Sequence, residues 1–229
     1  MRFIHIADVH CSASRIKSVN LILDELIKRT EQKDIDCIFF CGDFWDSPVM
    51  NTEGSGFVSV LNKIDCLVKN TSVLFLYGTP EHEPSGSLEV FKHMGCIVPE
   101  VMNYTPINVN GSEVVPISQP RLSLIPNKVK DKSKYVQNLF KSIPEKKSNH
   151  RIVLYHGDIV GAENQNGTVV IDNGYAVKTS TLKNMKADYI ACGHIHKPQQ
   201  VMDNCWYSGS AIPKNFGETH FGSYRLVDI

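Results

Sequence analysis

Short apolar runs alternate with amphipathic segments along the first half of the chain. Continuous apolar runs bounded by polar residues predict buried strands, and apolar side chains at helical spacing predict helices. The predicted strands cover residues 2–7, 37–41 and 73–77, and the predicted helices cover residues 16–30, 57–68 and 87–94. Gly95 ends the last of these helices. Strands that alternate with helices in this way favour an α/β fold.

The second half of the chain is richer in strands. Asn110-Gly111, which stands between two strand-like stretches, predicts a β-hairpin. Helical spacing returns at residues 131–143 and 180–186, and further strands are predicted at residues 152–155, 168–171, 189–192, 200–207 and 224–227. The sequence has no repeat, low-complexity tract or linker. We therefore expect a single domain over residues 1–229, with two packed mixed β-sheets flanked by helices in four α-β-β-α layers.

The charge balance excludes a globally basic nucleic-acid-binding protein, but one segment of the chain is basic. The 229 residues include 24 Lys or Arg and 24 Asp or Glu, so the chain cannot find nucleic acid by net charge alone. Residues 121–151, however, hold nine basic residues against two acidic ones. Candidate phosphate-binding side chains in this segment are Lys128, Lys130, Lys132 and Lys134. The alternative interpretation is a solvated helix face with flanking loops.

Cysteine usage and hydropathy bear on the location of the protein. The seven cysteines are an odd number without a C-x-x-C pair, which fits a reducing cytoplasm and argues against a zinc site built from thiolates. The apolar runs are far shorter than the roughly 18 residues of a membrane span, and the chain opens directly into a strand-like run. We expect neither a signal peptide nor a membrane anchor.

Five short polar motifs each follow an apolar, strand-like run. They are Asp8-Val9-His10, Gly42-Asp43-Phe44-Trp45-Asp46, Gly78-Thr79-Pro80-Glu81-His82-Glu83, His156-Gly157-Asp158 and Gly193-His194-Ile195-His196. Carboxylate and imidazole ligands suit divalent cations such as Mn²⁺ or Fe²⁺, and two adjacent cations need a bridging carboxylate, for which Asp43 is the natural candidate. Asp8 and His10 would point to the same side if the strand continued through them.

The ordered motifs resemble those of the calcineurin-like metallophosphoesterase superfamily, which are D-x-H, G-D-x-x-D, G-N-H-[DE], a lone H and G-H-x-H. A later stretch of the sequence narrows the resemblance to one branch of this superfamily. Tyr207-Ser208-Gly209-Ser210, followed by Phe216-Gly217-Glu218, is similar to a Y-x-G-S…F-G-E stretch of SbcD-type DNA repair exonuclease subunits. Ser47 and Tyr77 stand where the Ser/Thr protein phosphatase branch has arginine, which disfavours phosphomonoesters.

The resemblance implies a role for individual residues and two divalent metal ions, with Mn²⁺ expected and Fe²⁺ as the alternative. The implied ligands are Asp8, His10, Asp43 and His196 for the first metal, and Asp43, His156 and His194 for the second. A metal-bound hydroxide would attack phosphorus in line, His82 would act on the scissile phosphate and the leaving oxygen, and Asp46 would orient His82. Glu81, in a lengthened loop, takes the place of the family's second-metal Asn, and its ligation is left open.

The leading hypothesis is a metal-dependent phosphodiesterase that acts on DNA as an SbcD-type exonuclease. A phosphodiesterase for small nucleotides is the first alternative, because the net charge is zero and the family's capping domain is expected to be missing. A nucleic-acid-binding scaffold whose site has decayed at Glu81 is the second. The resemblance also suggests an SMC-like ATPase partner of the SbcC type, and a homodimer is left open.

Overall fold

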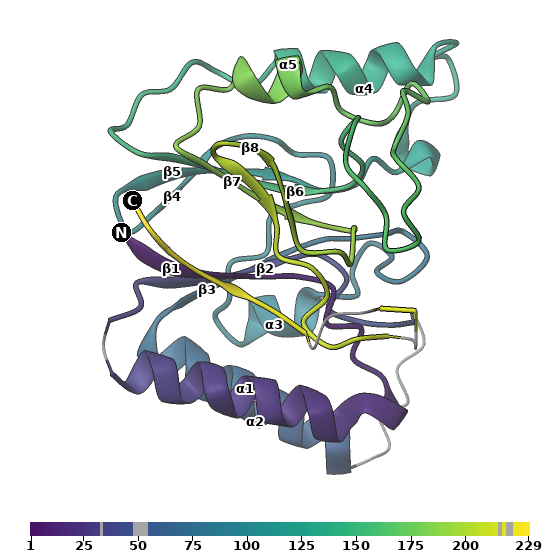
Figure 1. Cartoon of the computed structure of the whole chain (residues 1–229). Coiled ribbons are helices and arrows are strands. Elements are labelled where there is room, and N and C mark those ends of the chain that lie inside the picture. The colour runs from purple at the N-terminus through teal and green to yellow at the C-terminus, as the bar shows by residue number, and fades with distance from the viewer. Residues whose placement is uncertain (33, 48–54, 215–216, 219–221) are drawn as a thin grey trace.

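Two β-sheets pack face to face, and helices cover both outer sides of the pair (Figure 1). The computed structural model describes residues 1–229 except 33, 48–54, 215–216 and 219–221. The prediction of two mixed sheets flanked by helices in an α/β fold is therefore confirmed.

The first sheet combines three N-terminal strands with one C-terminal strand. Its strands, in spatial order, are β10 (Arg225–Asp228), β1 (Arg2–Ile6), β2 (Cys37–Cys41) and β3 (Ser72–Leu76). β1, β2 and β3 are parallel, with Phe3 opposite Cys37, and β10 is antiparallel to β1. The continuous apolar run of β2 follows from burial on both faces, since Ile38 packs toward the helices and Phe39 toward the other sheet.

The second sheet has six strands with antiparallel edges. In spatial order they are β4 (Ile107–Val109), β5 (Ser112–Ile117), β6 (Arg151–His156), β7 (Tyr189–Gly193), β9 (Cys205–Tyr207) and β8 (Gln199–Met202). The four strands from β5 to β9 are parallel. The predicted hairpin at Asn110-Gly111 joins β4 to β5.

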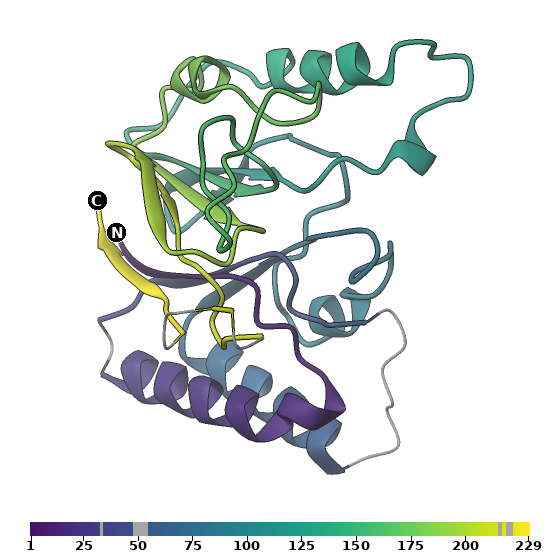
Figure 2. The same cartoon turned by 45° about the vertical axis from the view of Figure 1, so that its right-hand side comes forward.

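Helices form the two outer layers. Below the first sheet in Figures 1 and 2 lie α1 (Ile16–Glu31), α2 (Ser55–Asn70) and α3 (Glu89–His93). Above the second sheet lie α4 (Lys132–Lys141) and α5 (Thr179–Lys183), and two 3₁₀ turns, η1 (Ala13–Arg15) and η2 (Leu122–Leu124), complete the described helices. Within the described part of the chain, none of these helices has the length and apolarity to cross a membrane.

Two strand predictions are wrong. Residues 168–171 belong to the connection between β6 and β7, where Val169 makes one isolated bridge to Glu163 and Ile171 is 74% exposed. Their β-branched side chains favour a strand, but tertiary context overrides that preference. Residues 200–207, predicted as one strand, are the antiparallel pair β8 and β9, because the polar residues Asp203 and Asn204 form a turn between them.

Candidate metal centre

The five polar motifs meet at one end of the two sheets. They occupy the loops that follow β1, β2, β3, β6 and β7, at the right-hand end of the sheets in Figure 1. Parallel strands end at the same edge of a sheet, so side chains that follow them converge. The loops of the two sheets also touch, since His156 Nδ1 lies 2.8 Å from the carbonyl oxygen of Cys41 and donates to it.

Unusual backbone conformation concentrates in these loops. Four of the seven non-glycine residues with positive φ in the described chain belong to the motifs: Asp8 (53°), His10 (48°), Asp43 (51°) and His194 (95°). Such conformations cost of order 1–3 kcal/mol each and tend to occur at functional sites. The strand does not continue through Asp8 and His10, because β1 ends at Ile6 and both residues have positive φ, so the spacing of an extended strand does not explain how they meet.

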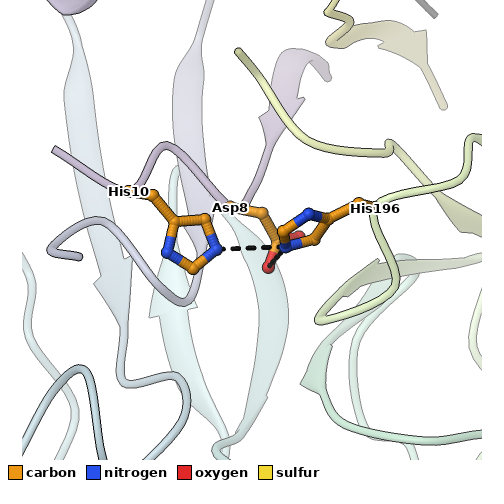
Figure 3. Close-up of side chains that lie close together, drawn as sticks. All are labelled: Asp8, His10 and His196. Carbon is orange, nitrogen blue, oxygen red and sulfur yellow. Dashed lines mark hydrogen bonds and ion pairs between the residues drawn. The ribbon is translucent and has the colours of Figure 1, made fainter. Parts of the chain in front are cut away.

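Asp8, His10 and His196 form the first cluster of metal-ligand atoms (Figure 3), with the atoms within 4.8 Å of one another. His10 Nε2 and His196 Nε2 face each other at 3.0 Å, and His196 Nε2 lies 3.9 Å from Asp8 Oδ1. Both oxygens of Asp8 accept from the backbone N–H of His194, at 3.0 and 2.9 Å. Burial lowers the pKa of His10 to about 2, so the ring is neutral and offers a lone pair.

Asp43, His156 and His194 form the second cluster. Asp43 Oδ2 lies 3.4 Å from His156 Nε2 and 4.0 Å from His10 Nε2, so this carboxylate connects the two clusters. Because His156 donates from Nδ1 to the Cys41 carbonyl, its Nε2 is the atom free to bind a cation. Gly42 allows this approach, since a Cβ there would collide with His156 Nδ1.

The charges of the second cluster reinforce one another. Burial by itself raises the pKa of Asp43, but His156, His10 and Thr79 together outweigh burial and hold the pKa well below the ordinary value. Burial lowers the pKa of His156, but Asp43, Asp8 and the Cys41 carbonyl together outweigh it and raise that pKa to about 9. In His194, burial and then the adjacent His156 lower the pKa to about 4. A cation in this cluster would replace the proton that Asp43 stabilises on His156.

His82 and Asp46 lie beside the first cluster. The atoms of His10, Asp46 and His82 form a third close group, and the rings of His10 and His82 are 4.8 Å apart between centroids. His82 Nδ1 donates to the backbone carbonyl of Asp46 at 2.6 Å. The Asp46 carboxylate instead lies 3.3 Å from His10 Nδ1 and 2.8 Å from Lys214 Nζ. Asp46 is thus placed to orient His82 through its main chain.

Glu81 lies apart from both clusters. Its side chain is exposed in the turn after β3 and belongs to none of the metal-ligand groups among the described residues. Thr79, two residues earlier, is the residue that reaches the second cluster. Its N–H and Oγ1 donate to the two oxygens of Asp43 at 2.6 and 2.8 Å, and Oγ1 lies 3.4 Å from His156 Nε2.

The four candidate lysines are not part of either cluster. Lys128 and Lys130 are exposed on the segment that leads into α4, and Lys134 is exposed within the helix. The half-buried Lys132, at the start of α4, donates to the carbonyl of Leu122 at 3.4 Å. Their role in binding phosphate stays a prediction.

Three further residues support the site, and the sequence analysis assigns none of them a role. Glu218 Oε1 accepts from His196 Nδ1 at 2.9 Å, and its Oε2 accepts from Ser210 Oγ at 2.7 Å. Buried Glu83 accepts from the N–H groups of the loops after β2 and β3. Asp158 Oδ1 lies 3.6 Å from His194 Nε2. The sequence marks Glu218 only by the F-G-E stretch, whose Phe216 lies outside the described residues.

The residues present fit two divalent cations. Each cluster combines a carboxylate with two imidazole rings, a donor set that suits borderline ions of the first transition row. In the first cluster, two imidazole nitrogens and a carboxylate oxygen face one space, an arrangement that a cation would satisfy. His156 and His196 each engage their second ring nitrogen with a protein acceptor, as is usual for metal-bound histidine.

Comparison with protein-family models matches residues 1–198 to the model described as calcineurin-like phosphoesterase. The match covers all five motifs and both sheets except β8, β9 and β10. Comparison with curated proteins finds no match.

Proposed function

Since the chain belongs to the calcineurin-like phosphoesterase family of metal-dependent enzymes, we propose that it hydrolyses phosphodiester bonds in DNA as an SbcD-type exonuclease. The observation that carries the proposal is the position of Asp43 between the two clusters, with His82 beside them. Two divalent cations, Mn²⁺ in our proposal, would supply Lewis-acid activation of the phosphoryl group. Asp8, His10 and His196 would hold one, and Asp43, shared with the first, would hold the other with His156 and His194.

His82 is the group that handles the proton of the leaving oxygen. Because the Asp46 carbonyl holds the proton on Nδ1, Nε2 is the ring nitrogen that exchanges a proton with substrate. The sugar alkoxide released from DNA is a poor leaving group, so His82 matters more for DNA than for a nitrophenyl ester. Glu218 and Thr79 act through the ligands, by orienting His196 and Asp43 respectively.

A phosphodiesterase for small nucleotides is the second candidate. It is favoured by a cavity of about 450 Å³ lined by Glu81, Gly157 and Asp158, next to the second cluster. A DNA enzyme makes several phosphate contacts, so its affinity falls steeply with salt, whereas an enzyme for small nucleotides responds weakly. A cytoplasmic location, supported by seven free cysteines, and an SbcC-type ATPase partner complete the proposal.

The test is digestion of single- and double-stranded DNA, labelled separately at each end, with Mn²⁺ and with EDTA. We expect release of nucleotides from an end with Mn²⁺, no release with EDTA, and a rate lowered at least about 100-fold in His82→Ala, in line with the contribution of a general acid or base. Hydrolysis of bis(4-nitrophenyl) phosphate with no attack on either DNA would reject the DNA enzyme in favour of the second candidate.

A further inference from the structure

A cavity of about 450 Å³ adjoins the candidate metal centre. Its lining residues come from four separate segments: 80–81, 119–123, Tyr155 with 157–158, and Asn173 with 175–176. Its volume lies within the roughly 300–1,000 Å³ that is usual for small-molecule sites. Asp158 belongs both to the wall of the cavity and to the surroundings of His194, whose Nε2 is 3.6 Å away. A phosphate at the metal centre therefore places its substituent at this cavity.

The cavity offers two flat or apolar side chains that the fold does not bury. Leu122 is 41% exposed and Tyr175 is 39% exposed, and the two come from different segments of the lining. Exposed aromatic and aliphatic side chains in a concave site typically contact a planar apolar ligand.

We propose that this cavity binds the nucleobase of a nucleotide whose phosphate lies at the metal centre. Leu122 and Tyr175, the exposed apolar and aromatic side chains of the lining, contact the faces of the base. The inference rests on the proposed function, because it places the base relative to a phosphate held there. The base belongs either to a free nucleotide or to the terminal residue of DNA, which share this chemistry.

Calorimetry of the Mn²⁺-loaded protein with thymidine 5′-monophosphate, deoxyadenosine 5′-monophosphate and deoxyribose 5-phosphate tests the proposal. The wild-type chain should bind both nucleotides at least about 10-fold more tightly than the sugar phosphate. Leu122→Ala and Tyr175→Ala should each weaken nucleotide binding about 10-fold, as expected for the loss of about 1.4 kcal/mol of stacking, and leave the sugar phosphate unchanged.

Leu124→Ala is the matched control. Leu124 is also an exposed leucine of η2, at 51%, but it does not line the cavity. It should change neither affinity. Equal affinity of the wild-type chain for nucleotides and sugar phosphate would overturn the proposal, and so would equal effects of Leu122→Ala and Leu124→Ala. A thymidine trinucleotide distinguishes the two sources of the base. If Leu122→Ala weakens binding of the trinucleotide, the cavity takes the base at a DNA end. If it weakens binding of the monophosphates alone, the cavity takes the base of a free nucleotide.

The outcome for the proposed function is read independently, from hydrolysis of bis(4-nitrophenyl) phosphate. Hydrolysis without a preference for nucleotides rejects the cavity proposal alone. A preference for nucleotides without hydrolysis of any diester rejects the proposed function.

Discussion

Glu218 is the residue whose effect on the site is most clearly defined by geometry. It is 7% exposed, is fixed by Ser210 and accepts from His196 Nδ1. Burial alone would raise the pKa of Glu218, but these hydrogen bonds outweigh burial and hold it below its ordinary value. Glu218 thus stays ionised and keeps the lone pair of His196 on Nε2.

Glu218→Gln should therefore weaken Mn²⁺ binding by about 10–100-fold, the usual cost of losing such a partner. Calorimetric titration of the metal-free protein with Mn²⁺ measures this loss. Glu163→Gln is the control, because the Glu163 carboxylate pairs with Lys197 at the surface and belongs to none of the metal-ligand groups among the described residues. Unchanged Mn²⁺ affinity in Glu218→Gln would exclude the orienting role.

His5 shows what a histidine does outside the site. It lies in β1, with Nε2 3.1 Å from the Cys192 carbonyl and Nδ1 3.1 Å from the Tyr189 hydroxyl, so Nε2 donates and Nδ1 accepts. Burial lowers its pKa from 6.5 to about 3. Between about pH 3 and pH 6.5, His5 therefore binds a proton in the unfolded chain but not in the folded chain.

The contribution of His5 to stability is complete above about pH 6.5 and is lost as the pH falls from there toward 3, by up to about 1.4 kcal/mol per pH unit. Urea unfolding at several pH values measures it. His5→Gln should flatten the decline in this window, whereas substitution of the exposed His93 by Gln should leave it intact. Parallel declines in both variants would contradict the assignment.

At the scale of the elements, Glu83 joins the two loops that carry the site. Its carboxylate accepts from the N–H groups of Asp43 at 3.2 Å, Phe44 at 2.7 Å, Trp45 at 3.1 Å and Gly78 at 2.7 Å. Burial and then the charge of Asp43 raise the pKa of Glu83 to about 7. The hydrogen bonds therefore position the loops after β2 and β3 at the cost of a desolvated carboxyl group.

Glu83→Ala leaves four N–H groups without this acceptor, so the free energy of unfolding should fall by about 3 kcal/mol or more. Glu81→Ala, two residues away on the exposed side of the same turn, should change it by less than about 0.5 kcal/mol. Denaturant unfolding compares the two variants. A loss below about 1 kcal/mol in Glu83→Ala would show that the loops do not depend on this side chain.

The basic segment before and within α4 makes a second prediction at this scale. If Lys128, Lys130, Lys132 and Lys134 bind DNA phosphates, replacing all four by Gln should weaken DNA binding. The slope of the logarithm of the binding constant against the logarithm of the salt concentration should also become shallower, by as much as about 0.9 for each phosphate that is no longer neutralised. Hydrolysis of a small chromogenic diester should be unaffected. A salt dependence equal to that of the wild-type chain would remove the segment from the DNA path.

The pattern of apolar residues predicts a strand well where both faces of the strand are buried, and poorly where the segment lies at the surface. The run at residues 37–41 becomes β2 with the predicted bounds, because both of its faces are buried. Residues 168–171 are all β-branched, which favours a strand, but they lie in a surface connection. The hydrogen bonds of Thr79, Glu83 and Glu218 depend on loops from distant parts of the chain, which spacing along the sequence cannot specify.

At the scale of the whole molecule, the centre spans the interface between the two sheets. Asp8 and Asp43 follow strands of the first sheet, whereas His156 is the last residue of β6 and His194 follows β7 in the second. The packing of the sheets therefore assembles the ligands, and cations bound there in turn stabilise the packed form, by about 2.7 kcal/mol at a concentration 100-fold above the dissociation constant. Asp43 is the ligand on which both halves depend, because it faces His10 and His156.

The number of Mn²⁺ ions bound per chain tests the central claim most directly. Calorimetric titration of the metal-free protein should give two equivalents for the wild-type chain and for Asp203→Ala, a change at an exposed turn, but no more than one for Asp43→Ala. One equivalent or none in the wild-type chain, or two retained by a folded Asp43→Ala variant, would contradict a two-cation centre joined by Asp43.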